Sequence, residues 1–377
     1  MKRLLLQLSN GYADNSMNTT QHFFFCLLRH ALAGSRLTSD DAEQLRTADW
    51  QAIYQMAARQ GLLAVLWDVV AQLPKECLPP RELKLRWALS AEGIAERYGR
   101  QRAVAAELAE RWSEAGLRPF VLKGFAVSRY YPVPEHRECG DFDCFLGDGR
   151  DVADKVAAEA GAWIEEPVGY KHTHIRYKKV VIENHRFCIA VRGNRQAKAF
   201  ERLLESLLAD DPQPEYVEGT RIGIPPVLFN ALFLAWHGLT HFLLEGIRFR
   251  HVYDWACFVE AEQERLDWGR FYAVCEQYHL RRFVDAMTAM AVRWCGVRIA
   301  NPAVVTESPY ADRILDSIFY DDSAVYNRGK GRWWGRTKVL SNIFRYQWKY
   351  RDIYQRSYVG QMAKLVGGFL FDRHPKL

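Results

Sequence analysis

The chain has 377 residues, 49% of them hydrophobic and 13% aromatic, and a net charge of +6. These values indicate an ordinary soluble globular protein with a large core and two or three subdomains. Residues 4–6 are apolar but polar residues follow at once, which excludes a signal peptide of sufficient length. The longest apolar stretch, 226–244, is interrupted by Asn230, His237, Thr240 and His241, so we expect a buried helix and not a membrane span. Eight scattered cysteines without a Cys-x-x-Cys pair are typical of reduced thiols in a cytoplasmic protein.

The first third of the chain predicts helices. Thr38 and Asp49 are candidate N-caps in front of segments with helical apolar spacing. Residues 81–115 alternate Arg and Glu among Ala and Leu, which predicts a long amphipathic helix that ends at Ala115-Gly116.

From residue 117 to about 191 the pattern changes to short strands separated by turns. Residues 119–122 predict a buried strand that leads through Lys123-Gly124 into a helical stretch over 125–131. Residues 172–177 and 180–189 alternate around Lys178-Lys179 and predict a hairpin. Residues 225–300 are helical again.

Two aspartates, Asp141 and Asp143, stand two residues apart in an apolar run that begins at Gly140 and closes at a turn over 147–149. Side chains two apart on a strand share a face, with Cα atoms about 7 Å apart. That separation suits carboxylates that bridge two divalent ions about 3.5–4 Å apart, and we expect both side chains to face an open cleft. The alternative is that the aspartates are helix caps or turn formers, which are common at strand ends.

A phosphate site is predicted beside this acidic pair. Gly124 at a strand-to-helix junction leaves amides at the helix start, where an anionic phosphate is favoured, and Lys123 would add a mobile cation. On a later strand, Glu183 and His185 also share one face because they are two residues apart.

A family resemblance is carried by four motifs: Leu122-Lys123-Gly124, Tyr131-Pro132, Arg137 and Gly140-Asp141-Phe142-Asp143. They are similar to motifs of the uncharacterised nucleotidyltransferases of the polymerase-beta-like superfamily. The similarity continues in residues 48–62, 183–185 and 236–254, and so covers most of residues 20–260. The chain departs from the pattern at Phe142, Asn184 and Arg186, and keeps all three acidic positions.

The resemblance implies an α+β fold with a mixed-sheet, polymerase-beta-like nucleotidyltransferase core at residues 116–195. A helical N-terminal region would occupy residues 1–115, and a helical region at 196–310 would complete the cleft. A basic, aromatic-rich helical tail would occupy residues 311–377.

It also implies a Mg²⁺-dependent transfer of an NMP group from an NTP to a hydroxyl-bearing acceptor, with AMP and ATP as the expected group and donor and Mn²⁺ as a substitute ion. Asp141, Asp143 and Glu183 are the implied catalytic residues and metal ligands. One ion would stabilise the leaving pyrophosphate and the second would activate the hydroxyl. Glu183 would be a ligand or the base that takes the hydroxyl proton, and its alternative is a solvent-facing strand carboxylate.

The predicted nucleotide-binding residues are Lys123, Gly124, Arg137, Gly140, His185, His237 and Asp254. Arg137 would reach the triphosphate or pair with a metal-site carboxylate, unless it is an exposed loop arginine. His185 could belong to the acceptor site or could be a partly buried, hydrogen-bonded histidine, and the sequence favours neither interpretation. His237 and His241 have the spacing of zinc ligands on a helix but no third ligand nearby, so we expect them to line the cleft or pair with Asp254.

The sequence does not distinguish a small molecule or sugar, a protein side chain or an RNA end as the acceptor. It does not indicate the oligomeric state either. A second reading is a catalytically inactive nucleotide- or polyanion-binding protein of the same fold. Residues 328–377 carry twelve Lys or Arg against two Asp, a net charge of +10, interleaved with Trp and Tyr. This pattern is typical of segments that bind nucleic acid or an anionic membrane surface, and the alternative is a helical tail packed on the core.

Overall fold

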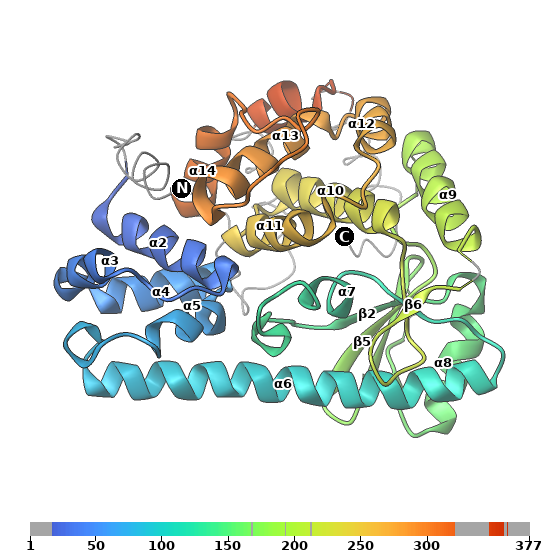
Figure 1. Ribbon diagram of the computed structural model, residues 1–377. Helices are drawn as coiled ribbons and strands as arrows, with labels where there is room; N and C mark the ends of the chain where they lie inside the picture. Colours follow the sequence, from blue (N-terminus) through green and yellow to red (C-terminus); the bar gives the residue numbers. More distant parts are fainter. Residues whose placement is uncertain are drawn as a thin grey trace.

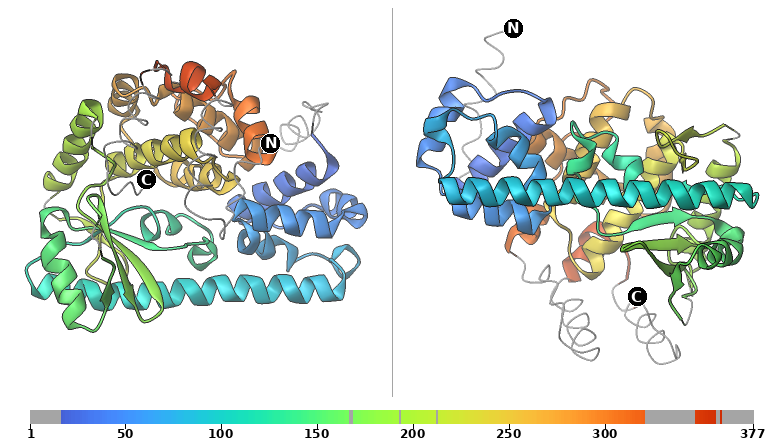
Figure 2. Two further views of the ribbon diagram at one scale, coloured as in Figure 1. Left: turned by 180° about the vertical axis from the view of Figure 1, so that it is seen from behind. Right: turned by 90° about the horizontal axis from the view of Figure 1, so that it is seen from below.

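The computed structural model describes residues 17–166, 169–192, 194–211, 213–320, 347–357 and 360. A seven-stranded mixed sheet is combined with helices from both ends of the chain (Figures 1 and 2). The predicted α+β class is therefore confirmed.

The helices predicted in the first third of the chain are present among the described residues. They are α2 (Thr19–Ala33), α3 (Ser39–Gln44), α4 (Trp50–Gln60), α5 (Leu63–Val70) and α6 (Arg81–Glu114). The predicted caps form, because the Thr38 side chain accepts from the Asp41 amide and the Asp49 side chain accepts from the Ala52 amide. The chain leaves α6 through Gly116, whose φ of +79° favours glycine.

The long helix α6 runs beneath both the N-terminal helices and the sheet (Figure 1). Its first half carries Trp87, which is fully buried and donates its indole N–H to the Leu63 carbonyl oxygen of α5 at 2.8 Å. Its second half carries Trp112, also fully buried, which donates to the Ala153 carbonyl oxygen at 3.0 Å. One helix thus contributes to two separate hydrophobic clusters.

The sheet has the strand order β3-β4-β5-β2-β1-β7-β6. The strands are β1 (Phe120–Val121), β2 (Phe142–Phe145), β3 (Trp163–Ile164), β4 (His172–Tyr177), β5 (Val180–His185), β6 (Glu215–Tyr216) and β7 (Gly223–Ile224). Two pairs, β2 with β5 and β1 with β7, are parallel, and the others are antiparallel.

The predicted hairpin is confirmed as β4 and β5, joined through Lys178 and Lys179, which both have positive φ angles. A two-residue turn of this kind matches the right-handed twist of the flanking strands. β5 ends at His185, four residues before the predicted end at 189, because the segment that follows turns toward α9 (Arg195–Ala209), where Glu201 accepts from the amides of Cys188 and Ile189. The sheet also extends past the predicted boundary at residue 195, since β6 and β7 belong to it.

The two faces of the sheet serve different purposes. Phe142, Cys144 and Ile182 are buried in the cluster that the sheet forms with α6 and α8 (Arg150–Glu159). Asp143 and Glu183, which alternate with these residues, therefore lie on the opposite face. That face is covered by the helical region after residue 225.

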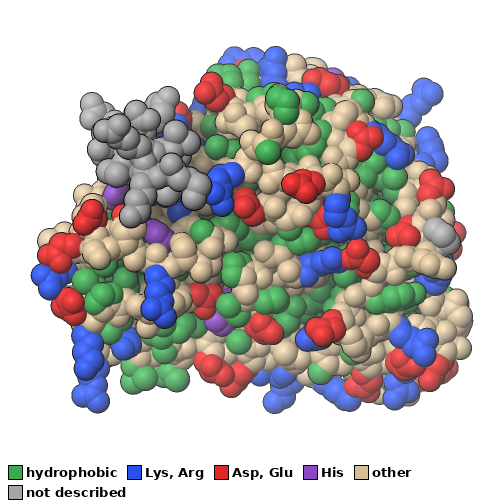
Figure 3. Space-filling view, in the orientation of Figure 1, with side chains coloured by type: hydrophobic (Ala, Val, Ile, Leu, Met, Phe, Trp, Pro, Cys, Tyr) green, Lys and Arg blue, Asp and Glu red, His purple; other side chains and the backbone are tan. Residues whose placement is uncertain are grey.

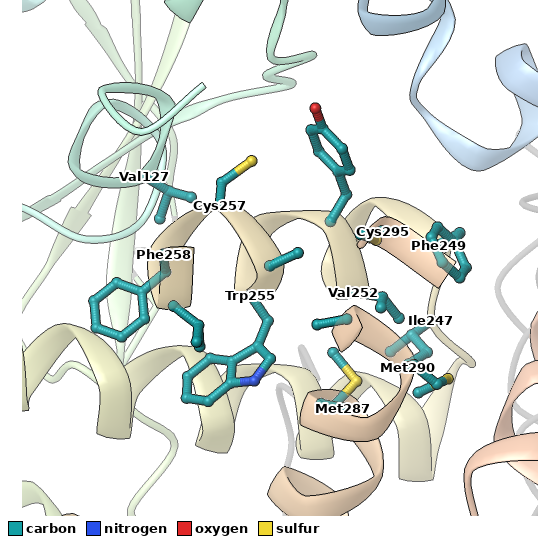
Figure 4. Close-up of a cluster of buried hydrophobic side chains, with 14 of the residues drawn as sticks. Val127, Ile247, Phe249, Val252, Trp255, Cys257, Phe258, Met287, Met290 and Cys295 are labelled. Carbon is teal, nitrogen blue, oxygen red and sulfur yellow. The ribbon is translucent and has the colours of Figure 1, made fainter. Parts of the chain in front are cut away.

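The helices predicted over residues 225–300 are present as α10 (Val227–Leu244), α11 (Phe249–Glu262), α12 (Trp268–Gln277) and α13 (Arg281–Met290). A further helix, α14 (Ala311–Tyr320), lies in the segment that the sequence assigned to the tail. Figure 4 shows Val252 and Trp255 of α11 beside Met287 and Met290 of α13, and Phe258 lies on the other side of Trp255, with which its ring stacks. By length and composition α10 is apolar enough to cross a membrane, but half of it is buried within the protein, as expected for a core helix.

Residues 347–357, a described part of the basic segment 328–377, pack on the core. Trp348 lies edge-on to Phe242 of α10 with ring centroids 5.6 Å apart, and the Arg313 guanidinium lies 4.1 Å from the centre of its ring. Lys349 is 2% exposed beside the same phenylalanine. Most of residues 328–377, including Arg345, lies outside the described residues.

Positive and negative side chains are interspersed with apolar ones over the face shown in Figure 3.

We expect Trp348→Ala to lower the free energy of unfolding by about 2 kcal/mol, because it removes a half-buried aromatic contact and a cation–π contact. Arg351→Ala is the matched control, since Arg351 is exposed and pairs with its neighbour Asp352. Urea denaturation measures both. Unchanged stability in the tryptophan variant, together with strongly salt-dependent oligonucleotide binding that Arg351→Ala weakens, would instead favour a nucleic-acid-binding tail.

Candidate active site

Most of the predicted site residues line one cavity between the sheet and the helical region. Those that line it are Lys123, Gly124, Arg137, Gly140, Asp141, Asp143, His237 and Asp254. The remaining two, Glu183 and His185, lie beside Asp143 on the neighbouring strand. The cavity is completed by α10, α11 and α13, which contribute Trp255, Phe283 and Met287 among others.

Asp143 is the most enclosed of the acidic residues. Its carboxylate lies 3.0 Å from Lys123 Nζ through one oxygen and 3.1 Å from His185 Nε2 through the other. Burial opposes ionisation, but Lys123 and His185 outweigh it and hold the pKa of Asp143 well below its usual range. The side chain is 3% exposed, so the expectation that both aspartates face an open cleft is wrong for Asp143.

Asp141 comes directly before β2 and is partly buried. The negative charge of Asp143 raises the pKa of Asp141, and burial and Glu183 act in the same direction. A carboxylate that is repelled by two others marks a position where a bound cation is stabilised.

The Lys123-Gly124 junction turns the chain from β1 into α7 (Phe125–Ser128). Lys123 and Gly124 both have positive φ angles, +54° and +48°. The helix is shorter than the predicted stretch of 125–131, and its first amides are used locally: Ala126 donates to the Lys123 carbonyl, and Val127 and Ser128 donate to the Gly124 carbonyl. A phosphate here would depend on the amides of Gly124 and Phe125 and on Lys123.

Glu183 lies directly beside Asp143 in the parallel register of β2 and β5. It is surrounded by three histidines, with His185 Nε2 3.2 Å from Oε2, His174 Nε2 3.3 Å from Oε1 and His172 Nδ1 3.5 Å from Oε2. Burial raises the pKa of Glu183, but the hydrogen bond from His185 and the charges of His172 and His185 outweigh it and lower the pKa to about 2. The solvent-facing reading of Glu183 is therefore wrong.

Arg137 ties the segment before β2 to the helical region. Its guanidinium forms two hydrogen bonds of 2.8 Å to the two carboxylate oxygens of Asp254 on α11, and Tyr131 donates to the same carboxylate at 2.6 Å. Arg137 is 5% exposed, so it is neither an exposed loop arginine nor the partner of a metal-site carboxylate. The Tyr131 and Arg137 motif positions thus share one structural role.

His237 and His241 lie on one side of α10 with ring centroids 4.4 Å apart. Neither pairs with Asp254: His237 lines the cavity, and His241 Nδ1 lies 3.3 Å from Glu245. Burial lowers the pKa of His237 well below its usual value, and the charge of Lys123 across the cavity adds to the effect.

Three residues at the site were not predicted from the sequence. Lys171, just before β4, has its pKa lowered by burial while the charges of Asp143 and Glu183 act in the opposite direction, which places a second lysine near the carboxylates. Arg250 lines the cavity and donates to the Glu138 carbonyl, and His251 lies near both His237 and His241. The Arg248-Phe249-Arg250-His251 run at the start of α11 is the one sequence signal for the last two.

Comparison with known families agrees with this geometry. The model of an uncharacterised nucleotidyltransferase family matches residues 46–296, about two-thirds of the chain. The matched range contains every residue that lines the cavity. This chain therefore belongs to that nucleotidyltransferase family. No curated protein and no solved structure matches it.

Proposed function

We propose that this protein is a Mg²⁺-dependent nucleotidyltransferase with a polymerase-beta-like core that transfers AMP from ATP to a hydroxyl group. The observation that carries the proposal is the convergence of Asp141, Asp143 and Glu183 on one face of the sheet, next to Lys123. Family membership supports the transfer of a nucleotidyl group in general.

The three carboxylates fit a hard divalent cation. Mg²⁺ prefers oxygen ligands, and the raised pKa of Asp141 reflects carboxylates whose mutual repulsion a cation would relieve. Asp141, Asp143 and Glu183 would hold the ion, which would neutralise phosphate charge and help pyrophosphate to leave. Mn²⁺ has the same preference for oxygen and would substitute.

Glu183 is better suited to hold a cation than to take a proton. With a pKa near 2 it is a weak base at neutral pH, and general bases work best when their pKa lies near the working pH. His174 and His185 fix both of its oxygens, which keeps the carboxylate ionised and oriented. Between the two roles given by the resemblance, we therefore assign the ligand role.

Lys123 and Lys171 would bind the phosphates of the nucleotide. The Lys123 ammonium lies 3.0 Å from Asp143, and the charges of Asp143 and Glu183 act on the pKa of Lys171. The charges of both lysines lower the pKa of His237 on the opposite wall. A triphosphate between the sheet and α10 would meet them there. The wall formed by Trp255, Phe283 and Met287 would receive an apolar part of the nucleotide or acceptor.

The proposal is tested by incubating the protein with each of the four NTPs and Mg²⁺ or Mn²⁺, with pooled metabolites, tRNA or protein as acceptors. Release of pyrophosphate that needs both the metal and ATP is the expected result. Nucleotide binding without pyrophosphate release under every combination would favour the inactive, binding-only reading.

Lys123→Ala is expected to weaken binding of ATP by about 10- to 100-fold, because a positioned cation on phosphate contributes roughly 1.5–3 kcal/mol. Calorimetry with a non-hydrolysable ATP analogue measures the change. Lys178→Ala is the control, since Lys178 is an exposed lysine of the β4–β5 turn that pairs with Glu107. Equal affinity in the wild type and Lys123→Ala would restrict Lys123 to its ion pair with Asp143.

A further inference from the structure

We infer that His172, Glu183 and His185 form a binding site for a zinc-type transition metal ion, which shares Glu183 with the carboxylates that would hold Mg²⁺. The inference goes beyond the proposed transferase activity and does not depend on it. It requires only that two imidazoles and one carboxylate bind an ion without nucleotide.

Two of the three distances between the ligand atoms match those of tetrahedral coordination. Zinc lies about 2.0–2.2 Å from nitrogen and oxygen ligands, so ligand atoms around a tetrahedral ion are about 3.3–3.5 Å apart. Glu183 Oε2 lies 3.2 Å from His185 Nε2 and 3.5 Å from His172 Nδ1. One ligand atom from each of the three residues lies within 4.8 Å of the others.

The hydrogen bonds of His185 indicate which ring nitrogen would bind. His185 Nδ1 lies 3.2 Å from the Phe187 carbonyl oxygen, which can only accept, so Nδ1 carries the proton. Without a metal, Nε2 donates to the carboxylates of Glu183 and Asp143, and a bound ion would take the place of that proton. An N–H that donates to a backbone carbonyl behind the ring is the usual support of a metal-binding histidine.

His172 and His174 complete the arrangement. His172 Nδ1 is buried and has no hydrogen-bond partner among the described residues. His174 lies on the same face of β4, where its Nε2 contacts Glu183 Oε1 and its Nδ1 contacts Glu165. His174 is thus a positioning residue, because it holds the oxygen of Glu183 that does not face His172 and His185.

The donor set selects the class of ion. Two histidines and one glutamate are a known zinc ligand set that leaves a fourth position open, whereas Mg²⁺ seldom binds imidazole nitrogen. The described residues contain one rival group, Cys26, His30 and Asp41. Burial raises the pKa of the Cys26 thiol to about 11, which disfavours the thiolate that a metal needs.

The test is calorimetric titration of the metal-stripped protein with Zn²⁺, in excess Mg²⁺ and without nucleotide. We expect binding of one Zn²⁺ that Mg²⁺ does not displace, and an affinity at least about 100-fold lower in His172→Ala. Even loss of a residue that supports a metal ligand costs about 10- to 100-fold. His172→Gln, which keeps a polar side chain, should lose affinity to a similar degree, and circular dichroism checks that both variants fold.

His30→Ala is the matched control and should bind Zn²⁺ like the wild type. Titration with Co²⁺ separates the two groups independently, because coordination by Cys26 would add an intense sulfur-to-metal absorption band. Zn²⁺ affinity that is unchanged in both His172 variants, affinity lost in His30→Ala, or displacement by Mg²⁺ would each overturn the inference. Since no NTP is present, a failed zinc titration and a failed transferase assay are distinguishable.

Discussion

Asp141→Ala should abolish nucleotidyl transfer while the melting temperature stays nearly the same. Its carboxylate is expected to hold the cation that stabilises the transition state, and such an ion contributes several kcal/mol, or at least about 100-fold in rate. The charge of Asp143 already opposes ionisation of Asp141, so its removal relieves repulsion and costs little stability. Pyrophosphate release and thermal denaturation measure the two effects.

Asp143→Ala should abolish transfer and also destabilise the protein. Asp143 neutralises Lys123 and accepts a hydrogen bond from His185, and loss of one partner from a buried ion pair costs about 3–5 kcal/mol. Lys123→Met combined with Asp143→Ala should recover part of that stability without activity. Near wild-type turnover in either aspartate variant would show that the carboxylates do not hold a catalytic metal.

The second large effect is expected at the Arg137–Asp254 pair. Arg137→Ala should lower the free energy of unfolding by about 3–5 kcal/mol, because it leaves the buried Asp254 carboxylate with Tyr131 as its remaining side-chain donor among the hydrogen bonds described above. Chemical denaturation of Arg137→Ala, Asp254→Ala and the double variant measures the coupling free energy between the two side chains. Arg186→Ala, which removes a partly exposed arginine near Asp148, is the control and should change stability by much less than Arg137→Ala does.

If the two single changes at Arg137 and Asp254 simply add in the double variant, the pair does not stabilise the fold as a unit. In that case the residues would be free to contact the nucleotide, as the sequence suggested for both. A drop in ATP affinity larger than the drop in stability explains would point the same way.

The local features of the fold could be predicted because their signals lie close together in the sequence. The caps at Thr38 and Asp49 and the Lys178-Lys179 turn each depend on neighbouring residues. The helix over residues 81–114 was evident from its periodicity. The strands β6 and β7 were missed because two residues each are too few to show an alternating pattern.

The residues of the candidate site could be predicted where they lie together on one strand. Contacts between segments that are distant in the sequence could not be predicted. Asp141 and Asp143 share a face through alternation alone, whereas His172 and His174 reach Glu183 through pairing of β4 with β5. No sequence pattern indicates that Arg137 pairs with Asp254, which is 117 residues away. The family resemblance instead predicts nucleotide contacts for both residues. Burial of Asp143 likewise depends on the helices packed over the sheet.

Because α6 stabilises two cores at once, the segment that carries the candidate site is not expected to fold without the helices before it. A fragment that began at residue 116 would lack Trp112 and the rest of the surface against which one face of the sheet is buried. A fragment that ended before α6 would expose the pocket that Trp87 fills between α4 and α5. Insertions, fusions and recombination during evolution are therefore expected to preserve α6 as an uninterrupted unit, and to change the chain at its ends or in the loops between the later helices.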